Sequence, residues 1–458
     1  MGVIAQKRLD LLRGMMRSLP RPSLRSLETA LGLSKDGAMS EVREMISAEL
    51  ESRHIKETVF GPFMPLFDER DDGLSGVVFD RWIVDRLWSA LDARQPDMLV
   101  AARQALNAKR ADDPTPTVLF DLIDLAAEIC RETPEAVMRP TPGPEDAAEV
   151  AEFANYLDLH RIIRALLNRM SDFMGRVDAE KAAALRLMFK DACAIDVEGG
   201  YRFLECLFAN LDDGAQIVKF VATVSDRPND RFLASSELAG FGERILDGIE
   251  QRLNELKAFM GPRGKVCEDL VSCGHRVAQS LAQLQSFEHY IELSREGPWG
   301  KRVAAAHKMI AEMVETQLNG AEKLVGEVLP VKAERVYGKI RKETPRIDRP
   351  PNEALVARTR QTMVFIKGVR NTAQAGGFAS LHTKTVQALE TMLDGYFEEM
   401  LAIANGPDAF DPEMVLAYFG VVTDLMDGLL GEEKAQVARR RVASSDLNKP
   451  RTPQAGAA

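Results

Sequence analysis

Apolar residues recur along this chain at alternating intervals of three and four positions. The clearest run consists of Tyr156, Leu159, Ile163, Leu166, Met170, Phe173 and Val177. Because an α-helix turns once in 3.6 residues, this spacing places every member of the run on one stripe of a helix. Similar runs occupy residues 245–260, 314–328, 389–403 and 415–429. The pattern predicts amphipathic helices that are each several turns long.

Proline and glycine lie between these runs and indicate where the helices end. Gly-Pro pairs occur at 261–262, 297–298 and 406–407, and a Pro-Pro pair occurs at 350–351. Glycine ends helices because its backbone is conformationally too flexible. Proline ends them because it lacks an N–H group and clashes with the preceding turn. Helices of limited length favour bundle packing over one continuous coiled coil. We therefore predict an all-α fold of multi-helix bundles in two or three helical blocks.

Strand patterns are scarce. Residues 216–224 (QIVKFVATV) are rich in β-branched side chains and are compatible with a short strand. They lie between helical patterns and have no second run to pair with, so we interpret them as a buried helix.

Proline-rich stretches divide the helical pattern into blocks. We expect an N-terminal helical block at 1–131, a proline-rich linker at 132–145 and a central long-helix bundle at 146–343. A second linker at 344–352 precedes a C-terminal helical bundle at 353–441. Residues 442–458 are polar and lack an apolar period, which predicts a disordered tail.

The composition is that of a soluble globular protein, with 45% hydrophobic and 28% charged residues. The net charge is −10, yet both ends of the chain are basic. Five scattered cysteines do not form a disulfide framework and indicate free thiols in a reducing compartment, so we expect a cytoplasmic location. No apolar run approaches the ~18 residues that a membrane span needs, so we predict no transmembrane segment.

Residues 23–50 predict a short helix, a glycine-containing turn and a second helix. The stretch LGLSKDGAMSEVREMI resembles the helix–loop–helix of the SAP fold in its Gly-Leu-Ser, its later glycine and its closing aliphatic helix. Members of that family commonly bind DNA or RNA, although Met39 stands where the family usually has lysine. The candidate phosphate contacts are Arg21, Arg25, Lys35 and Arg43. An ordinary pair of packing helices is the interpretation we favour.

Two apolar segments are candidates for contact with a partner. The stripe of Tyr156, Leu159, Ile163, Leu166, Met170 and Phe173 would seat a helix of another protein or a second copy of this chain, which makes a homo-oligomer one prediction. Residues 59–67 (VFGPFMPLF) form a docking patch if exposed and cap a core if folded back. We favour the core.

Metal and catalytic patterns are weak. Cys267, Cys273 and His275 are close in sequence, but the two cysteines lie on different faces of a helix, so we interpret them as structural thiols and a surface histidine. We find no glycine-rich phosphate loop and no nucleophile elbow. The sequence therefore predicts no catalytic, cofactor-binding or metal-binding residue, and no cofactor.

Residues 332–349 hold seven basic residues against three acids, a surface that would suit an acidic protein, a nucleic acid or the chain's own acidic middle.

The function we favour from the sequence is that of a non-catalytic helical interaction protein, an adaptor, scaffold or regulator that acts through protein–protein contacts. One alternative is a nucleic-acid-linked regulator that uses the N-terminal unit. The other is an enzyme whose site forms only in the fold.

Overall fold

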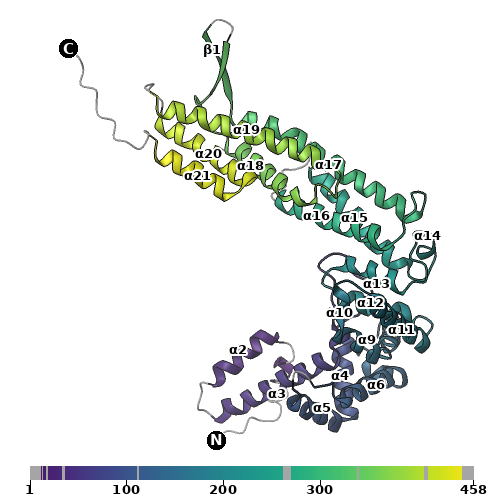
Figure 1. Ribbon diagram of the computed structural model, residues 1–458. Coiled ribbons are helices and arrows are strands. Elements are labelled where there is room, and N and C mark those ends of the chain that lie inside the picture. Colours follow the sequence, from purple (N-terminus) through teal and green to yellow (C-terminus); the bar gives the residue numbers. More distant parts are fainter. Residues whose placement is uncertain are drawn as a thin grey trace. The chain divides into compact units, whose positions relative to one another are not determined.

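The computed structural model describes residues 12, 14–16, 19–32, 37–110, 113–260, 270–337, 340–406 and 411–445, and for 37–38, 333–337 and 340–342 the backbone alone. The chain divides into two compact units, Met1–Asp226 (unit 1) and Arg227–Ala458 (unit 2). Both units are built almost entirely from helices, which confirms the predicted all-α fold of helical bundles (Figure 1).

The described helices of unit 1 are mostly short. They are α2 (Arg21–Gly32), α3 (Gly37–Val59), η1 (Gly61–Phe67), α4 (Trp82–Arg94), α5 (Pro96–Ala108), α6 (Thr117–Glu132), α7 (Pro134–Val137), α8 (Asp146–Leu157), α9 (His160–Asn168), α10 (Met170–Met174), α11 (Ala179–Ile195), α12 (Gly199–Ala209), η2 (Gly214–Gln216) and α13 (Ile217–Val224). Helix α13 is buried along most of its length, which confirms that this β-branched segment is a helix.

An aromatic cluster lies at the core of unit 1. Phe63 and Phe67 come from η1, whose two prolines hold the segment in a tight 3₁₀ turn, and both are buried. They meet Phe153 of α8 at ring-centroid distances of 6.2 and 5.2 Å, in edge-to-face geometry. Phe79 contacts the same ring at 5.2 Å. The apolar segment at 59–67 is therefore folded back into the core, as predicted.

Cationic side chains cap the carboxyl ends of helices throughout unit 1. The last carbonyls of a helix lack intrahelical partners, and a positive group also interacts favourably with the helix dipole there. Among the described residues, the side chains that donate to such carbonyls from another element include Arg70, Arg86, Arg131, Arg164, Arg186 and Lys219. These cations, which range from buried Lys219 to exposed Arg131 and Arg186, thus join helices to one another.

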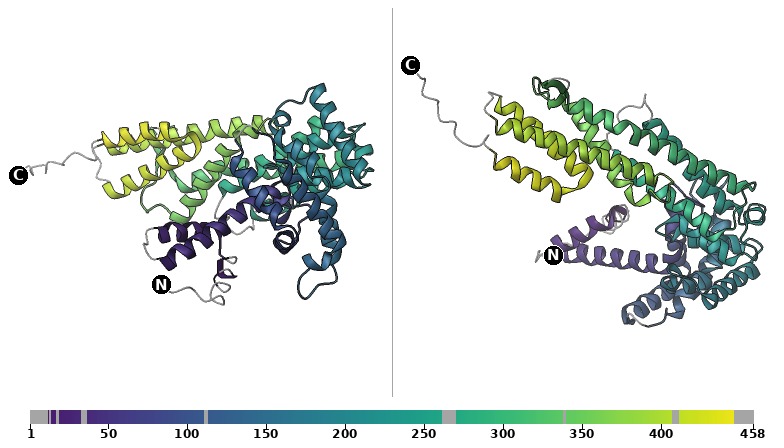
Figure 2. Two further views of the ribbon diagram at one scale, coloured as in Figure 1. Left: turned by 90° about the horizontal axis from the view of Figure 1, so that it is seen from below. Right: turned by 45° about the horizontal axis from the view of Figure 1, so that its top comes forward.

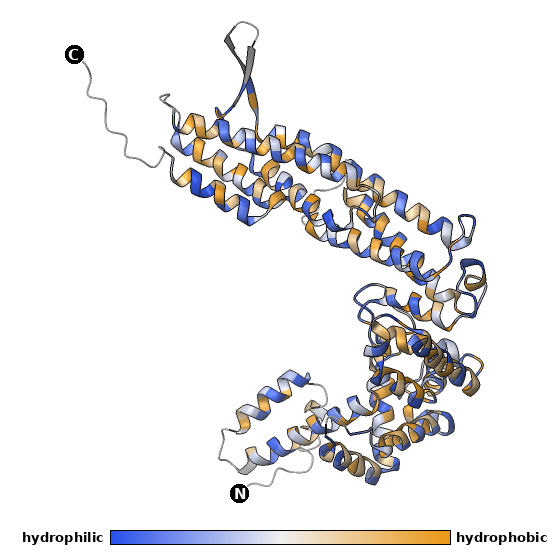
Figure 3. Ribbon diagram, viewed as in Figure 1, coloured by the Kyte–Doolittle hydropathy of each residue, from blue (hydrophilic) through white to orange (hydrophobic). Residues whose placement is uncertain are grey.

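Unit 2 is built on long helices. Its elements are α14 (Asp230–Leu233), α15 (Ala239–Met260), α16 (Leu270–Tyr290), α17 (Pro298–Val328), β1 (Val331–Tyr337), β2 (Ile340–Pro345), α18 (Glu353–Gly368), η3 (Arg370–Thr372), α19 (Ala379–Ala404), α20 (Pro412–Leu430) and α21 (Glu432–Ala443). Helix α17 packs against α15, α18 and α19, and α20 packs against α18, α19 and α21 (Figure 2). Hydrophobic and hydrophilic residues share each long helix (Figure 3), and the apolar stripes form the core.

A two-stranded antiparallel hairpin stands out from the helices of unit 2 (Figure 1). Strand β1 pairs with β2 from Val331 opposite Pro345 to Tyr337 opposite Ile340, with a register shift between Arg335 and Tyr337. The sequence did not predict it, because we assigned residues 146–343 to a helical bundle.

Several predictions on the chain's organisation stay open. The division after Asp226 falls inside the block 146–343, and the predicted block boundaries stay predictions. Helix α21 continues to Ala443, and most of the predicted tail, residues 446–458, lies outside the described residues. Within the described residues, no helix is long and apolar enough to cross a membrane.

Candidate functional site

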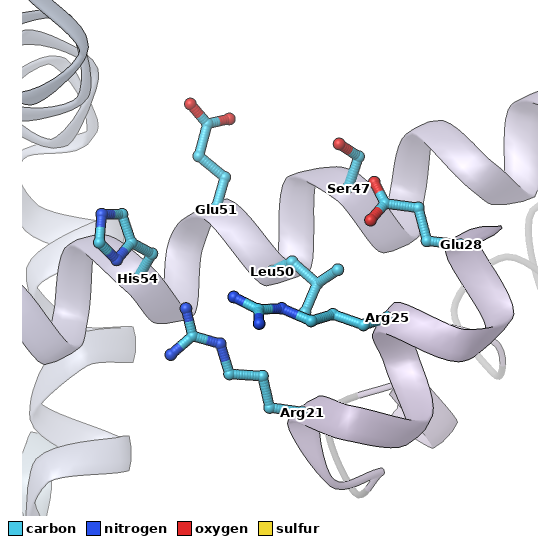
Figure 4. A pocket seen from close by; sticks show the side chains of 7 residues that line it. All are labelled: Arg21, Arg25, Glu28, Ser47, Leu50, Glu51 and His54. Atoms are coloured by element: carbon cyan, nitrogen blue, oxygen red, sulfur yellow. The ribbon is translucent and has the colours of Figure 1, made fainter.

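A cleft of about 540 Å³ lies between α2 and α3 in unit 1 (Figure 4). Its lining consists of Arg21, Arg25 and Glu28 of α2 and Ser47, Leu50, Glu51 and His54 of α3. Each set has the spacing of one helix face. A small core beside the cleft holds the two helices together; it includes Leu24 and Ile46, both buried, and Leu50 packs against it. We call this the α2–α3 cleft.

The two arginines of the α2–α3 cleft differ in their pairing. Both reach from α2 towards α3, near Leu50 and His54 (Figure 4). Arg21 forms an ion pair with Glu57, and its Nε is buried with no hydrogen-bond acceptor among the described residues. Arg25 is exposed, and nothing in the described part of the chain accepts a hydrogen bond from its guanidinium. Arg25 is therefore a cation available to a ligand.

Carboxylates share the α2–α3 cleft with these cations. Glu28 points towards Ser47, while Glu51 projects away from both arginines (Figure 4). Glu51 also accepts a hydrogen bond from Asn107 at 3.2 Å and lies 3.5 Å from Arg103. The cleft thus presents both signs of charge around the apolar side chain of Leu50.

The structure brings two of the four predicted nucleic-acid contacts, Arg21 and Arg25, into one cleft. Arg43 lies farther along the helix pair, with its Cζ 3.4 Å from the position where a Cβ on Gly32 would stand. It is exposed and, like Arg25, has no partner within the described residues. Lys35 lies outside the described residues. The predicted pair of helices is confirmed as α2 and α3.

The predicted stripe at 156–173 does not form one helix. The helix breaks at Asp158 and Leu159 and again at Arg169, so three helices, α8, α9 and α10, carry the stripe. The prediction that one helix carries all of it is wrong. Five of its six residues are buried inside unit 1 and one, Met170, is half-buried. Their role as a partner interface stays a prediction, and their observed contacts are those of a core.

An Asp–His pair in unit 1 resembles part of a catalytic site. The His160 Nε2 lies 2.8 Å from Oδ1 of Asp124, which also accepts a hydrogen bond from Arg161 at 2.6 Å. Burial lowers the pKa of His160 below its usual value despite the neighbouring carboxylate. Burial of Asp124 has the opposite effect, but hydrogen bonds from His160 and Arg161 keep its pKa below the usual value. The Nδ1 of His160 has no described partner, so no nucleophile completes a triad here.

A buried arginine organises another polar cluster. Arg202 is 5% exposed and binds both carboxylate oxygens of Glu152, at 2.7 and 2.9 Å. It also pairs with Asp196 and Glu198. Burial opposes its charge, but the carboxylates outweigh burial and raise its pKa. The cluster ties α8 to α12 and its preceding loop, so its evident role is structural.

Lys219 occupies a different kind of site. Its ammonium donates to the carbonyls of Phe173 and Gly175 at the end of α10, and burial lowers its pKa. Because both carbonyls belong to a helix end, this lysine acts as a helix cap.

The sequence motif with two cysteines and a histidine gains no support as a metal site. Cys267 lies outside the described residues, Cys273 is buried and His275 is exposed. No group of three or more metal-binding side chains occurs among the residues that the structure describes.

Burial raises the pKa of Cys130 to about 12, which leaves this thiol protonated and unreactive at neutral pH.

Unit 2 contains a groove that sequence reasoning missed. A space of about 350 Å³ lies between α17 and α19 at the base of the hairpin, and we call it the α17–α19 groove. Its lining residues are Val325, Gly326, Leu329, Val331, Glu343, Pro345, Thr391, Met392, Gly395, Tyr396 and Glu399. The available signal was the alternation of apolar and charged residues at the start of 331–345, before a glycine that suits a tight turn.

Comparisons with known proteins identify no relative of this chain. No family model matches it, and neither the curated proteins nor the solved structures searched gave a match. The SAP-like interpretation of residues 23–50 therefore stays a prediction, and function has to be argued from the residues themselves.

Proposed function

We propose that this protein is a non-catalytic helical interaction protein, an adaptor, scaffold or regulator, that binds a partner protein through the α2–α3 cleft. The observation that carries the proposal is the pair of exposed, unpartnered guanidiniums of Arg25 and Arg43 on this helix pair. Arginine is enriched in protein interfaces because its planar fork can bind a carboxylate with two hydrogen bonds.

The charges of the cleft favour a protein over a nucleic acid. Glu28 and Glu51 line the same space as Arg25, and their carboxylates would repel a phosphate backbone. A protein segment carries both signs of charge, so its own lysines and carboxylates could complement both sets of groups. Leu50 adds an apolar contact between them.

One observation favours the nucleic-acid alternative. Residues 1–25, which include Arg21 and Arg25 of the cleft, carry six basic residues against one acid in the sequence. Binding to phosphates would release counterions, so affinity would fall steeply as salt is raised. Salt dependence therefore separates the two candidates.

The test compares partners captured by three forms of the full-length chain: wild type, the double variant Arg25→Glu with Arg43→Glu, and Arg176→Glu. Arg176 is exposed and has no described partner, so it controls for charge reversal alone. After cross-linking in the native cell, we expect proteins that are enriched by wild type and by Arg176→Glu to be lost with the double variant. Circular dichroism would verify that all three forms keep their helices.

Two results would overturn the proposal. One is a set of captured proteins that the double variant leaves unchanged. The other is binding of purified wild type to DNA or RNA that weakens steeply with salt and disappears in the double variant, which would establish the alternative instead. Homo-oligomerisation stays a separate prediction, which the molar mass of the purified chain in solution would decide.

A further inference from the structure

The α17–α19 groove has walls that suit an apolar side chain. Val325 of α17 and Leu329, which directly follows α17, line it on one side and Met392 of α19 lines it on the other. Val331 at the start of the hairpin is 48% exposed beside it. Its volume of about 350 Å³ is sufficient for one or two side chains of a ligand. An apolar side chain that entered it would leave water and bury these walls as well.

Two glycines in helix interiors open the groove. Gly326 of α17 and Gly395 of α19 both line it, and a Cβ added to either would meet nothing within 4 Å. Alanine would therefore fit at both positions and would favour each helix more than glycine does. Glycine instead leaves both helix backbones open to close approach by a bound chain.

The polar groups of the groove define the charge of its occupant. Among the described side chains that line the groove, Glu343 and Glu399 are acidic and none is basic, so a cation that reached Glu343 would meet an opposite charge. Glu343 is exposed and has no described partner, so its carboxylate is available. The hydroxyl of Tyr396 is buried and has no hydrogen-bond partner among the described residues. A polar group that reached this hydroxyl would give it the hydrogen-bond partner that it lacks among the described residues.

The hairpin beside the groove favours a polypeptide over a small molecule. Its sheet has only two strands in the described part of the chain, so backbone N–H and C=O groups along the outer edges have no strand partner. An extended segment can pair with such an edge while one of its side chains enters a neighbouring pocket.

We propose that the α17–α19 groove is a second docking site, which binds an extended segment of a partner protein carrying a lysine or arginine next to an aliphatic side chain. The aliphatic side chain packs between Val325, Leu329 and Met392, and the cation pairs with Glu343. This inference deepens the proposed function, because it assigns a second surface and a chemical class to the interaction.

The test begins with a displayed library of random peptides, selected on the immobilised full-length protein. Enriched peptides are then synthesised, and their binding to four forms of the chain is measured by fluorescence anisotropy. These forms are wild type, Gly395→Leu, Glu343→Lys and Gly420→Leu. Gly420 lies on the exposed face of α20 with nothing within 4 Å of an added Cβ and does not line the groove, so it is the matched control.

We expect the enriched peptides to share a basic residue beside an aliphatic one. Gly395→Leu fills the groove and Glu343→Lys reverses its charge, so each should weaken binding at least about tenfold, a loss typical of central interface residues. Gly420→Leu should leave binding unchanged. Both leucine variants should keep or raise the melting temperature, because leucine favours a helix more than glycine does. Lost binding would therefore not reflect lost folding.

Three outcomes overturn the groove proposal: no peptide is enriched, the enriched peptides lack the basic–aliphatic pair, or Gly395→Leu binds them as well as wild type. The double variant at Arg25 and Arg43 separates this proposal from the proposed function. It should bind the groove peptides normally, while it loses the partners of the α2–α3 cleft. The experiments can therefore refute either docking proposal while the other one stands.

Discussion

Replacing Gly242 by alanine should destabilise unit 2, although alanine is the better helix former. A Cβ on Gly242 of α15 would lie 2.5 and 2.6 Å from two ring carbons of Trp299. The indole is fully buried, its N–H donates to Glu243 Oε1 at 2.6 Å, and its ring meets Phe287 edge-on at 5.8 Å. The indole ring therefore cannot rotate to make room, and α15 and α17 would have to move apart.

The expected change in the free energy of unfolding of Gly242→Ala is the balance of two contributions. Overpacking a filled core costs about 1–3 kcal/mol, while exchanging glycine for alanine inside a helix contributes about 1 kcal/mol of stabilisation. Because ordinary contacts begin near 3.4 Å, we place the clash at the upper end and expect a net loss of about 1–2 kcal/mol. Gly420→Ala is the matched control: its Cβ meets nothing within 4 Å, so it should gain about 0.5–1 kcal/mol.

Scanning calorimetry of the full-length chain would measure both variants. For a unit of this size, 1 kcal/mol shifts the melting temperature by about 2–4 °C. The unit 2 transition should therefore fall by about 2–8 °C with Gly242→Ala and rise by about 1–4 °C with Gly420→Ala. Adding Trp299→Phe to Gly242→Ala should cost less than Trp299→Phe costs alone, since the smaller ring makes room for the methyl group. The reasoning is refuted if Gly242→Ala is as stable as Gly420→Ala.

Three further predictions concern unit 1. The pKa of His160 lies below 6.5 in the folded state, so the unfolded chain binds more protons as the pH falls below about 7. The free energy of unfolding should therefore drop by up to about 1.4 kcal/mol per pH unit until the folded pKa is reached. Urea titrations of His160→Gln should lack this pH dependence, and an unchanged slope would contradict the prediction. Arg202→Met should lower the free energy of unfolding by about 2–3 kcal/mol, because it leaves three carboxylates without their cation; a change below about 0.5 kcal/mol would mean that the cluster is not stabilising. In the native protein at about pH 8, iodoacetamide should label exposed Cys193 and spare Cys130, which mass spectrometry would detect; equal labelling would show that the core opens.

The sequence was sufficient for the fold class because helices leave a local, periodic pattern. The stripes at 245–260 and 389–403 lie within α15 and α19, and their apolar members are mostly buried. The same pattern misled us at 156–177, where the apolar interval continues through two helix breaks that lack glycine and proline. At Asp158 and Leu159 the backbone stays in the right-handed helical region, so the break leaves little mark on the sequence.

The hairpin and the two candidate sites were harder to predict. Arg335 interrupts the alternation of apolar and charged residues that begins at Val331, and no neighbouring strand supported the pattern. The α2–α3 cleft joins residues that are 33 positions apart at Arg21 and His54, and the α17–α19 groove needs three separate elements. No local pattern encodes such meetings; only Arg21 and Arg25 could be chosen in advance, from their charge.

The capping of helix ends in unit 1 has a consequence for biosynthesis. Arg70 donates to the carbonyls of Phe208 and Leu211, which lie 138 and 141 residues later in the chain. Arg164 likewise returns to the carbonyl of Val59, 105 residues earlier. A nascent chain on the ribosome therefore cannot form the Arg70 contacts until nearly half of its residues have been made, whereas Val59 is already present when Arg164 is added. Until the end of α12 has been made, Arg70 lacks these acceptors, so this part of unit 1 is completed only by residues added much later.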